Sequence, residues 1–154
     1  MECVTVLPAA KDDLPRILAL EEQCFSYPHT MEQLCYEMED NLHDLIVAKK
    51  GQAVLGYVGM SHILDEGYIS NGAVDGKFRR QGIADALLSA LDAASDRYAL
   101  AFISLEVRES NEPAIRLYEK NGYEKTGRIP GCYSHPKEDA LVMTKTYHRE
   151  RKPS

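Results

Sequence analysis

The stretch from Ile69 to Leu91 constrains the fold more than any other, because it joins a strand, a tight basic turn and a long amphipathic helix. We expect the strand over residues 68–74, the turn over residues 75–81 and a helix opened by Gly82. The helix is predicted from apolar residues that recur every three or four positions and therefore share one helical face. These residues are Ile83, Ala84, Leu87, Leu88, Leu91 and Ala94.

The turn before this helix has the features of an anion site. It combines unpaired backbone N–H groups, the positive end of a helix dipole and the cations Arg79 and Arg80. Gly82 and Ala84 leave room for a phosphate to reach the backbone amides. An ordinary strand–turn–helix with a solvated basic turn explains the spacing equally well. The nucleotide-binding motifs GxxxxGK and GxGxxG are not found in this turn.

Residues 79–84, RRQGIA, resemble the pyrophosphate turn of the GCN5-related N-acetyltransferases (GNAT). In that family the turn begins with Arg or Gln, has glycine at its fourth position and ends with Gly or Ala. The resemblance implies that this turn binds the pyrophosphate of acetyl-CoA. The cofactor-binding residues that it implies here are Arg79, Arg80, Gln81, Gly82, Ile83 and Ala84.

Length and charge limit the class of protein. A chain of 154 residues with 44% hydrophobic content predicts one domain with a substantial core, which we assign to residues 1–149, followed by a frayed tail over residues 150–154. The net charge of −6 argues against direct nucleic-acid binding and suits a cationic substrate. No signal peptide or membrane-spanning apolar run is evident, which predicts a cytoplasmic protein without membrane association.

The cysteines and histidines show no metal or disulfide pattern. Cys3, Cys24, Cys35 and Cys132 form no CxxC pair, which favours reduced thiols. The histidines have no ligand spacing, and we therefore expect no metal. They are His29, His43, His62, His135 and His148.

The first half of the chain contains strand and helix signals in alternation. We expect a strand over residues 3–7, then a helix capped by Asp12. Thr30 and Gln33 form a capping box that opens a helix to about Asp40. Residues 44–49 and 53–63 then predict a hairpin around the turn at Lys50–Gly51.

A nearly continuous apolar run over residues 100–107 predicts a central strand, which Glu106 interrupts. Burial of a carboxylate is costly unless the group is paired, hydrogen-bonded or near solvent. Two interpretations stay open for Glu106: a salt bridge to Arg108 or Arg116 at the edge of the core, or a working acid–base group at the end of the strand.

The next helix is expected to start at residues 110–113, with proline in its first turn, and to end at Asn121–Gly122. Asn111, Ile115 and Tyr118 lie on one face of this helix. From spacing alone, Tyr118 is better explained as a core residue whose hydroxyl bonds a carbonyl.

Residues 105–145 resemble the C-terminal half of RimI-type enzymes, bacterial N-acetyltransferases that modify a ribosomal protein. The shared motifs are LEVR (residues 105–108), SN (110–111), AIRLYEKNGY (114–123) and EDALVM (138–143). Together with NGAVDGKFRRQGIA (71–84), the likeness extends from about Ile69 to Thr146. It implies an α/β (α+β) GNAT fold, a mixed, mostly antiparallel seven-stranded sheet with about four helices on its faces. It implies acetyl-CoA as co-substrate, and as acceptor the N-terminal alanine of ribosomal protein number eighteen of the small subunit.

The same resemblance implies roles for single residues. Glu106 corresponds to the general base, and Tyr118 to the acid that protonates the departing CoA thiolate. The backbone N–H near Val74 is the expected oxyanion donor, with a bulge at Gly72. The residues implied to line the acetyl-CoA channel are Gly72, Ala73, Val74, Asn111 and Tyr118.

The acceptor groove is expected between residues 25–29 and residues 131–134. Both segments depart from the family, which has tryptophan at the position of His29 and a tyrosine pair at Cys132–Tyr133. The substrate-binding candidates are Phe25, Tyr27, His29 and Tyr133.

The cost of deprotonation favours an N-terminal acceptor. An α-amine with a pKa of about 7.8 costs about 0.5 kcal/mol to deprotonate at roughly pH 7.5, whereas a lysine side chain costs about 4 kcal/mol. We expect direct transfer in a ternary complex rather than a ping-pong route, because no cysteine accompanies the Glu106–Tyr118 pair in the sequence, and Cys132 is the only candidate nucleophile. We also expect a monomer. A small-amine acetyltransferase and a non-catalytic acyl-CoA-binding module remain as alternatives, although a pure binder needs neither Glu106 nor Tyr118.

Overall fold

The computed structural model describes residues 3–25, 28–79, 81–134 and 136–148. These form one seven-stranded sheet with the strand order β1-β2-β3-β4-β5-β7-β6. The strands are β1 Val4–Pro8, β2 His43–Lys50, β3 Ala53–Ile63, β4 Glu66–Val74, β5 Phe102–Arg108, β6 Glu124–Ser134 and β7 Lys137–Thr146. The helices are η1 Lys11–Asp13, α1 Leu14–Cys24, α2 Met31–Glu39, η2 Gly76–Phe78, α3 Ile83–Tyr98 and α4 Glu112–Lys120.

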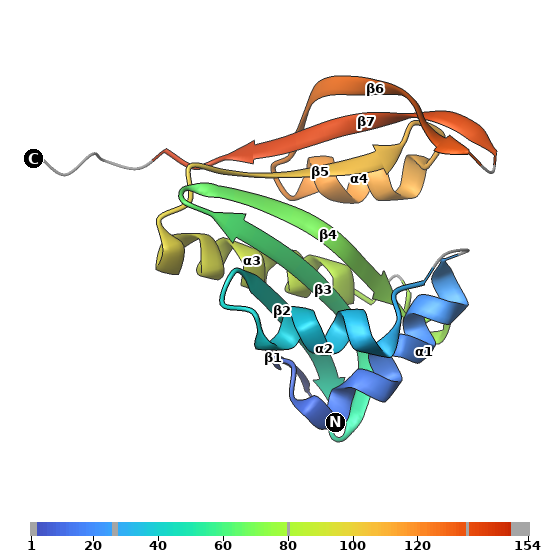
Figure 1. Ribbon diagram of the computed structural model, residues 1–154, viewed down its shortest axis with the longest axis vertical. Helices are drawn as coiled ribbons and strands as arrows, with labels where there is room; N and C mark the ends of the chain where they lie inside the picture. The colour runs from blue at the N-terminus through green and yellow to red at the C-terminus, as the bar shows by residue number, and fades with distance from the viewer. Residues whose placement is uncertain (1–2, 26–27, 80, 135, 149–154) are drawn as a thin grey trace, which may run out of the picture.

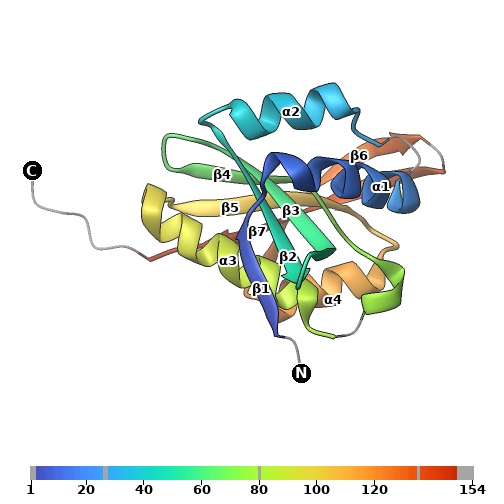
Figure 2. The ribbon, with the colours of Figure 1, turned by 90° about the horizontal axis from the view of Figure 1, so that it is seen from below.

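Both faces of the sheet are covered by helices (Figures 1 and 2). Helices α1 and α2 lie on one face, and α3 and α4 lie on the other. Strand β2 shows the consequence for the sequence: Leu45 and Val47 pack with α1 and α2, whereas Ile46 and Ala48 belong to the core on the α3 side. A strand buried on both faces therefore reads as a continuous apolar run.

Strands β4 and β5 are parallel and pair over a short distance only. All other neighbouring strands are antiparallel. Between β4 and β5 the paired residues are Glu66 with Phe102, Gly67 with Ile103 and Tyr68 with Ser104. Both strands continue past these pairs and separate from one another (Figure 1).

A β-bulge marks the point of separation. In the β3–β4 pairing Met60 faces Ile69 and Gly59 faces Asn71, so Ser70 is the extra residue. A bulge bends its strand and increases its twist, which turns β4 away from β5. The bulge expected at Gly72 therefore lies at Ser70, two residues earlier.

The mixed, mostly antiparallel seven-stranded sheet expected from the sequence is confirmed, and so is the capping box of α2. Thr30 Oγ1 accepts from the Gln33 backbone N–H at 3.2 Å, and Gln33 Oε1 accepts from that of Thr30 at 2.8 Å. The expectation that Asp12 caps the first helix was wrong. Asp13 is the N-cap residue of α1, and its carboxylate instead accepts from the Ala10 N–H at 2.8 Å in the preceding 3-10 turn.

Candidate active site

A cleft of about 790 Å³ lies where β4 and β5 separate. Its walls come from α1, β4, β5, α4 and β6. It brings together side chains that lie far apart in the sequence. The sequence-predicted site residues that line it are Phe25, His29, Gly72, Glu106, Asn111, Tyr118 and Tyr133.

Glu106 lies on the open side of β5. Its neighbours Leu105 and Val107 are buried, while Glu106 is exposed and lines the cleft. Tyr68 on β4 donates a hydrogen bond to the Glu106 carboxylate. Burial, followed by the charge of Glu106 and this hydrogen bond, raises the pKa of Tyr68 to about 12. Tyr68 therefore keeps its proton at neutral pH and orients the carboxylate.

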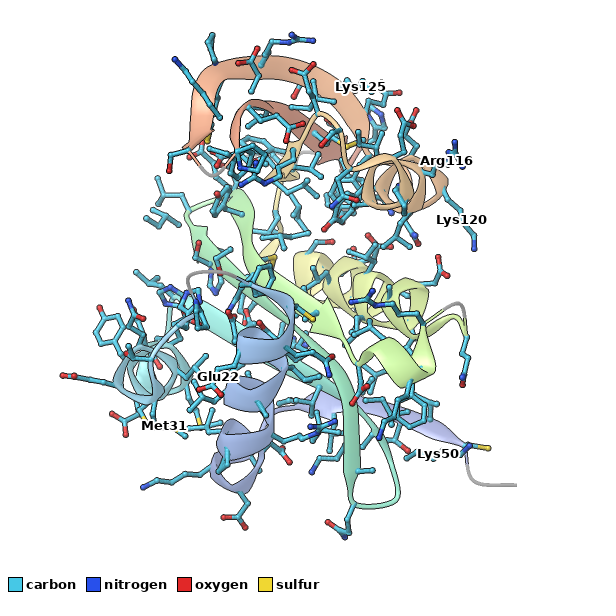
Figure 3. The ribbon with its side chains drawn as sticks, turned by 90° about the vertical axis from the view of Figure 1, so that its right-hand side faces the viewer. Glu22, Met31, Lys50, Arg116, Lys120 and Lys125 are labelled. Carbon is cyan, nitrogen blue, oxygen red and sulfur yellow. The ribbon has the colours of Figure 1, made fainter. Side chains whose placement is uncertain are left out.

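The two arginines considered as salt-bridge partners of Glu106 pair elsewhere. Arg108 Nη1 lies 3.2 Å from Glu138 Oε1. Arg116 Nη2 lies 3.9 Å from Glu112 Oε2, and Figure 3 shows Arg116 projecting outward from α4. The ion pairs of the described residues thus favour the second interpretation of Glu106, an acid–base group facing a cleft.

Tyr118 lies on the face of α4 that borders the cleft, where it is half-buried. Its ring packs edge-on against Tyr123, with 5.8 Å between the ring centroids. Burial raises the pKa of the Tyr118 hydroxyl, so this group is protonated at neutral pH. Within the described part of the chain the Tyr118 hydroxyl has no hydrogen-bond partner. This differs from the core interpretation, in which the hydroxyl would bond a carbonyl.

Asn111 and Gly72 both line the cleft. Asn111 is the N-cap of α4 and accepts from the Ala114 N–H at 3.3 Å, so its side chain is held at the start of that helix. Ala73 and Val74 lie further along β4, opposite Tyr57 and Gly56 of β3, and are outside the lining of this cleft.

The basic turn leads into α3 through a left-handed glycine. Gly82 is the N-cap of α3, is exposed, has φ of +78°, and a Cβ built there would meet no atom within 4 Å. Gln81 is exposed and Ala84 half-buried, but Ile83 is only 2% exposed and belongs to the core.

Two cations were expected in this turn. Arg79 is exposed, and its guanidinium lies 3.8 Å from the Cys24 sulfur at the end of α1. Arg80 lies outside the described residues. The first turn of α3 is also connected to α4, because Asp85 accepts from Asn121 at 2.9 Å and from Lys120 at 3.3 Å. The turn is thereby fixed relative to the helix that carries Tyr118; Lys120 is labelled in Figure 3.

Three of the four acceptor candidates, Phe25, His29 and Tyr133, line the cleft. Phe25 is 39% exposed and directly follows α1. Tyr133 comes from β6, which is an edge strand of the sheet. The Arg108 guanidinium lies over the Tyr133 ring, 4.3 Å from its centroid. The fourth candidate, Tyr27, lies outside the described residues.

Glu21 is a site residue that sequence reasoning missed. It is 1% exposed, lines the cleft, and accepts hydrogen bonds from the Tyr57 hydroxyl, from Asn71 Nδ2 at 3.0 Å and from the His29 backbone N–H at 3.3 Å. Burial, together with the hydrogen bond to Glu21, raises the pKa of Tyr57. The available signal was its spacing, since Glu21 follows Leu14 by seven positions and Ile17 by four on the apolar face of α1.

Two further observations concern other classes of site. No group of three His, Cys, Asp or Glu side chains within the described ranges is arranged to hold a metal ion. No helix in those ranges has both the length and the apolar character needed to cross a membrane.

Comparisons with known proteins place this geometry among acetyltransferases. Residues 14–123 match the model of the Acetyltransferase (GNAT) family. A Bacillus subtilis protein, named provisionally as a ribosomal protein bS18-alanine N-acetyltransferase, is 33% identical over 135 residues, covering 86% of this chain and 88% of that protein. An N-alpha-acetyltransferase of Saccharolobus solfataricus is 31% identical over 160 residues, covering 92% of each. The crystal structure of the Escherichia coli ribosomal-protein-S18-alanine N-acetyltransferase superposes with a TM-score of 0.88 at 25% identity, covering 97% of each chain.

Proposed function

The chain belongs to the Acetyltransferase (GNAT) family and is an acetyl-CoA-dependent N-acetyltransferase, and we propose that its acceptor is the N-terminal amine of a protein. The acceptor that we propose more specifically is the N-terminal alanine of ribosomal protein bS18, which the names of the Bacillus and Escherichia relatives contain. The observation that carries the proposal is the cleft between β4 and β5, which Glu106, Tyr118 and the acceptor candidates Phe25, His29 and Tyr133 line.

The start of α3 fits the pyrophosphate of acetyl-CoA. The exposed left-handed Gly82 leaves open space over the helix N-terminus, where backbone N–H groups and the helix dipole favour an anion. We assign this contact to the backbone of residues 81–84, with Arg79 and Arg80 supplying charge. The Gly72–Val74 segment and Asn111 are proposed to line the path of the acetyl end. Acetyl-CoA supplies the activated thioester.

Glu106 and Tyr118 are proposed to divide the proton transfers. Glu106 faces the cleft and accepts a hydrogen bond from Tyr68, so its carboxylate can take the proton of the incoming ammonium, directly or through a water. Tyr118 keeps its proton because burial raises its pKa, and it can donate that proton to the departing thiolate. The low cost of deprotonating an α-amine makes one carboxylate sufficient.

Acetylation of three acceptor classes tests the proposal. A peptide with the N-terminal sequence of ribosomal protein bS18, a blocked peptide with an internal lysine, and a polyamine would each be offered with acetyl-CoA, and CoA release would be measured. We expect kcat/KM for the alanine peptide to exceed the other two by at least about 100-fold. Faster transfer to the polyamine would reassign the enzyme to small amines.

Two variants separate an enzyme from a non-catalytic acyl-CoA-binding module. Glu106→Gln should lose most CoA release, while Glu124→Gln, which removes an exposed carboxylate on β6, should retain the parent rate. No peptide-dependent CoA release from the parent protein, with acetyl-CoA still bound, would support the binding module instead.

A further inference from the structure

The imidazole of His29 lies between two carboxylates from different helices. Its Nδ1 is 3.2 Å from Glu21 Oε1 on α1, and its Nε2 is 3.4 Å from Glu37 Oε1 on α2. A neutral imidazole has one N–H, whereas an imidazolium has two. Only the imidazolium can therefore donate to both carboxylates at once.

This bridge continues into the sheet. Glu21 also accepts from the Tyr57 hydroxyl on β3 and from Asn71 Nδ2 on β4. A continuous set of polar contacts thus extends from β4 through Glu21 and His29 to α2. Glu37→Gln would replace the carboxylate at the last contact with an uncharged amide, without touching the other contacts.

The bridge also borders the cleft. Glu21, His29 and Asn71 all contribute to its lining, as does Phe25 at the end of α1. Glu37 lies behind them on α2 and is outside the lining. The end of α1 and the segment that joins it to α2 therefore form this side of the cleft, which is the side assigned to the acceptor.

We propose that His29 is a positioning residue that, as an imidazolium, ties α1 to α2 and holds the acceptor side of the cleft in its binding shape. Acceptor binding then depends on the protonation of His29, whereas acetyl-CoA binding at the α3 turn does not. The assignment of this side of the cleft to the acceptor rests on the proposed function; the bridge itself does not.

The groups that act on this cluster come from four elements. They are Glu21 and Cys24 on α1, Glu37 on α2, Tyr57 on β3 and His43 on β2. Burial raises the pKa of Glu37, and the charges of His29 and His43 oppose that rise. The bridge is complete when His29 is protonated and Glu37 is ionised. Because burial raises the pKa of Glu37, protonation of that carboxyl at low pH removes one of the two acceptors.

The acceptor KM tests the proposal. It would be measured at about pH 6 and about pH 8.5 for three proteins: the parent, His29→Gln and Glu37→Gln. The ratio of variant to parent KM cancels the titration of the acceptor amine, which is the same in all three measurements. We expect both variants to show an acceptor KM about 5-fold to 10-fold above the parent at the lower pH and within about 2-fold at the higher pH. Acetyl-CoA KM should stay within about 2-fold throughout.

Glu37→Gln distinguishes positioning from packing, since it leaves the imidazole in place. Glu39→Gln is the matched control, because it removes an exposed carboxylate from the same helix. An acceptor KM ratio that does not change with pH, or a Glu37→Gln profile equal to that of the parent, would overturn the proposal.

Thermal unfolding tests the bridge without any acceptor. The Tm of the parent should exceed that of Glu37→Gln by more at about pH 6 than at about pH 8.5, because donation to both carboxylates requires an imidazole that carries two N–H groups. If no peptide is acetylated, the proposed function fails while this measurement still decides the bridge. An equal Tm difference at both pH values would reject it.

Discussion

Tyr68 on β4 donates a hydrogen bond to Glu106 on β5 at the end of the short parallel pairing between these strands. The pairing ends at Tyr68 and Ser104, and Glu106 follows Ser104 by two residues on the same face of β5. The carboxylate thus lies where the strands begin to separate and the cleft begins. Tyr68 of β4 therefore orients the proposed base, Glu106 of β5, at the point where the two strands separate and open the cleft.

Tyr68→Phe should lower kcat for peptide acetylation by about 10-fold, because Glu106 loses the donor that orients its carboxylate. Acetyl-CoA affinity and Tm should change little, since Tyr68 is 37% exposed. Steady-state kinetics with saturating acetyl-CoA would measure the effect. Tyr36→Phe, on the exposed surface of α2, is the control and should keep the parent kcat. An unchanged kcat in Tyr68→Phe would remove Tyr68 from the site.

Glu106→Gln should lower kcat/KM for the alanine peptide by about 10²–10⁴ near neutral pH, because the proposed base is lost while the shape is kept. The deficit should shrink as pH rises past the pKa of the acceptor amine, since the amine then arrives neutral. A pH–rate profile from about pH 6.5 to 9.5 would measure this recovery. A deficit that stays constant over this range would contradict the assignment of Glu106 as base.

Tyr118→Phe should lower kcat by about 10²–10⁴ with no recovery at high pH, because the missing proton belongs to the departure of the thiolate. In the parent protein, burial raises the pKa of Tyr118, so activity that depends on its proton should fall only above about pH 10. Acetyl-CoA binding by calorimetry should match the parent. Recovery of Tyr118→Phe parallel to that of Glu106→Gln would reject the division of roles.

Gly82→Glu should abolish acetyl-CoA binding, weakening it by at least about 100-fold. The substitution places a side chain and a negative charge over the helix N-terminus, and the left-handed φ of +78° adds strain of about 1–2 kcal/mol. Calorimetric titration with acetyl-CoA would measure the loss. Gly127→Glu adds the same charge to an exposed position on β6 and should bind acetyl-CoA normally. Parent-like binding by Gly82→Glu would exclude this turn as the pyrophosphate site.

Asp75→Asn should destabilise the fold by about 1–2 kcal/mol at neutral pH. Asp75 is buried, accepts from the Lys77 N–H at 3.0 Å and pairs with Arg16 of α1. The Lys77 hydrogen bond and then Arg16 lower the pKa of this carboxyl, so its contribution should be complete above about pH 4 and lost as pH falls further. Urea unfolding between about pH 7 and 3 would follow the loss. Asp12→Asn, an exposed neighbour of the α1 cap, should change stability by less than about 0.5 kcal/mol.

Local signals in the sequence determined much of this protein. The period of apolar residues predicts α3, the Thr30–Gln33 pair predicts the start of α2, and the RRQGIA turn predicts a glycine-opened helix N-terminus. Each signal depends on residues within a few positions of each other, so backbone hydrogen bonds and side-chain caps can act on it directly. The RRQGIA turn also carried part of the resemblance to the family.

The acceptor side of the cleft was decided by the tertiary structure. Glu21 reads as one of several acidic residues, yet it is buried because Tyr57, 36 positions later, and Asn71, 50 positions later, donate to it. The contact between Tyr68 and Glu106 depends on the register of the parallel strands β4 and β5. Helix α3 connects these strands, but its sequence does not determine their register. Such contacts depend on how whole elements pack, because the burial of a carboxylate becomes favourable only once distant donors surround it.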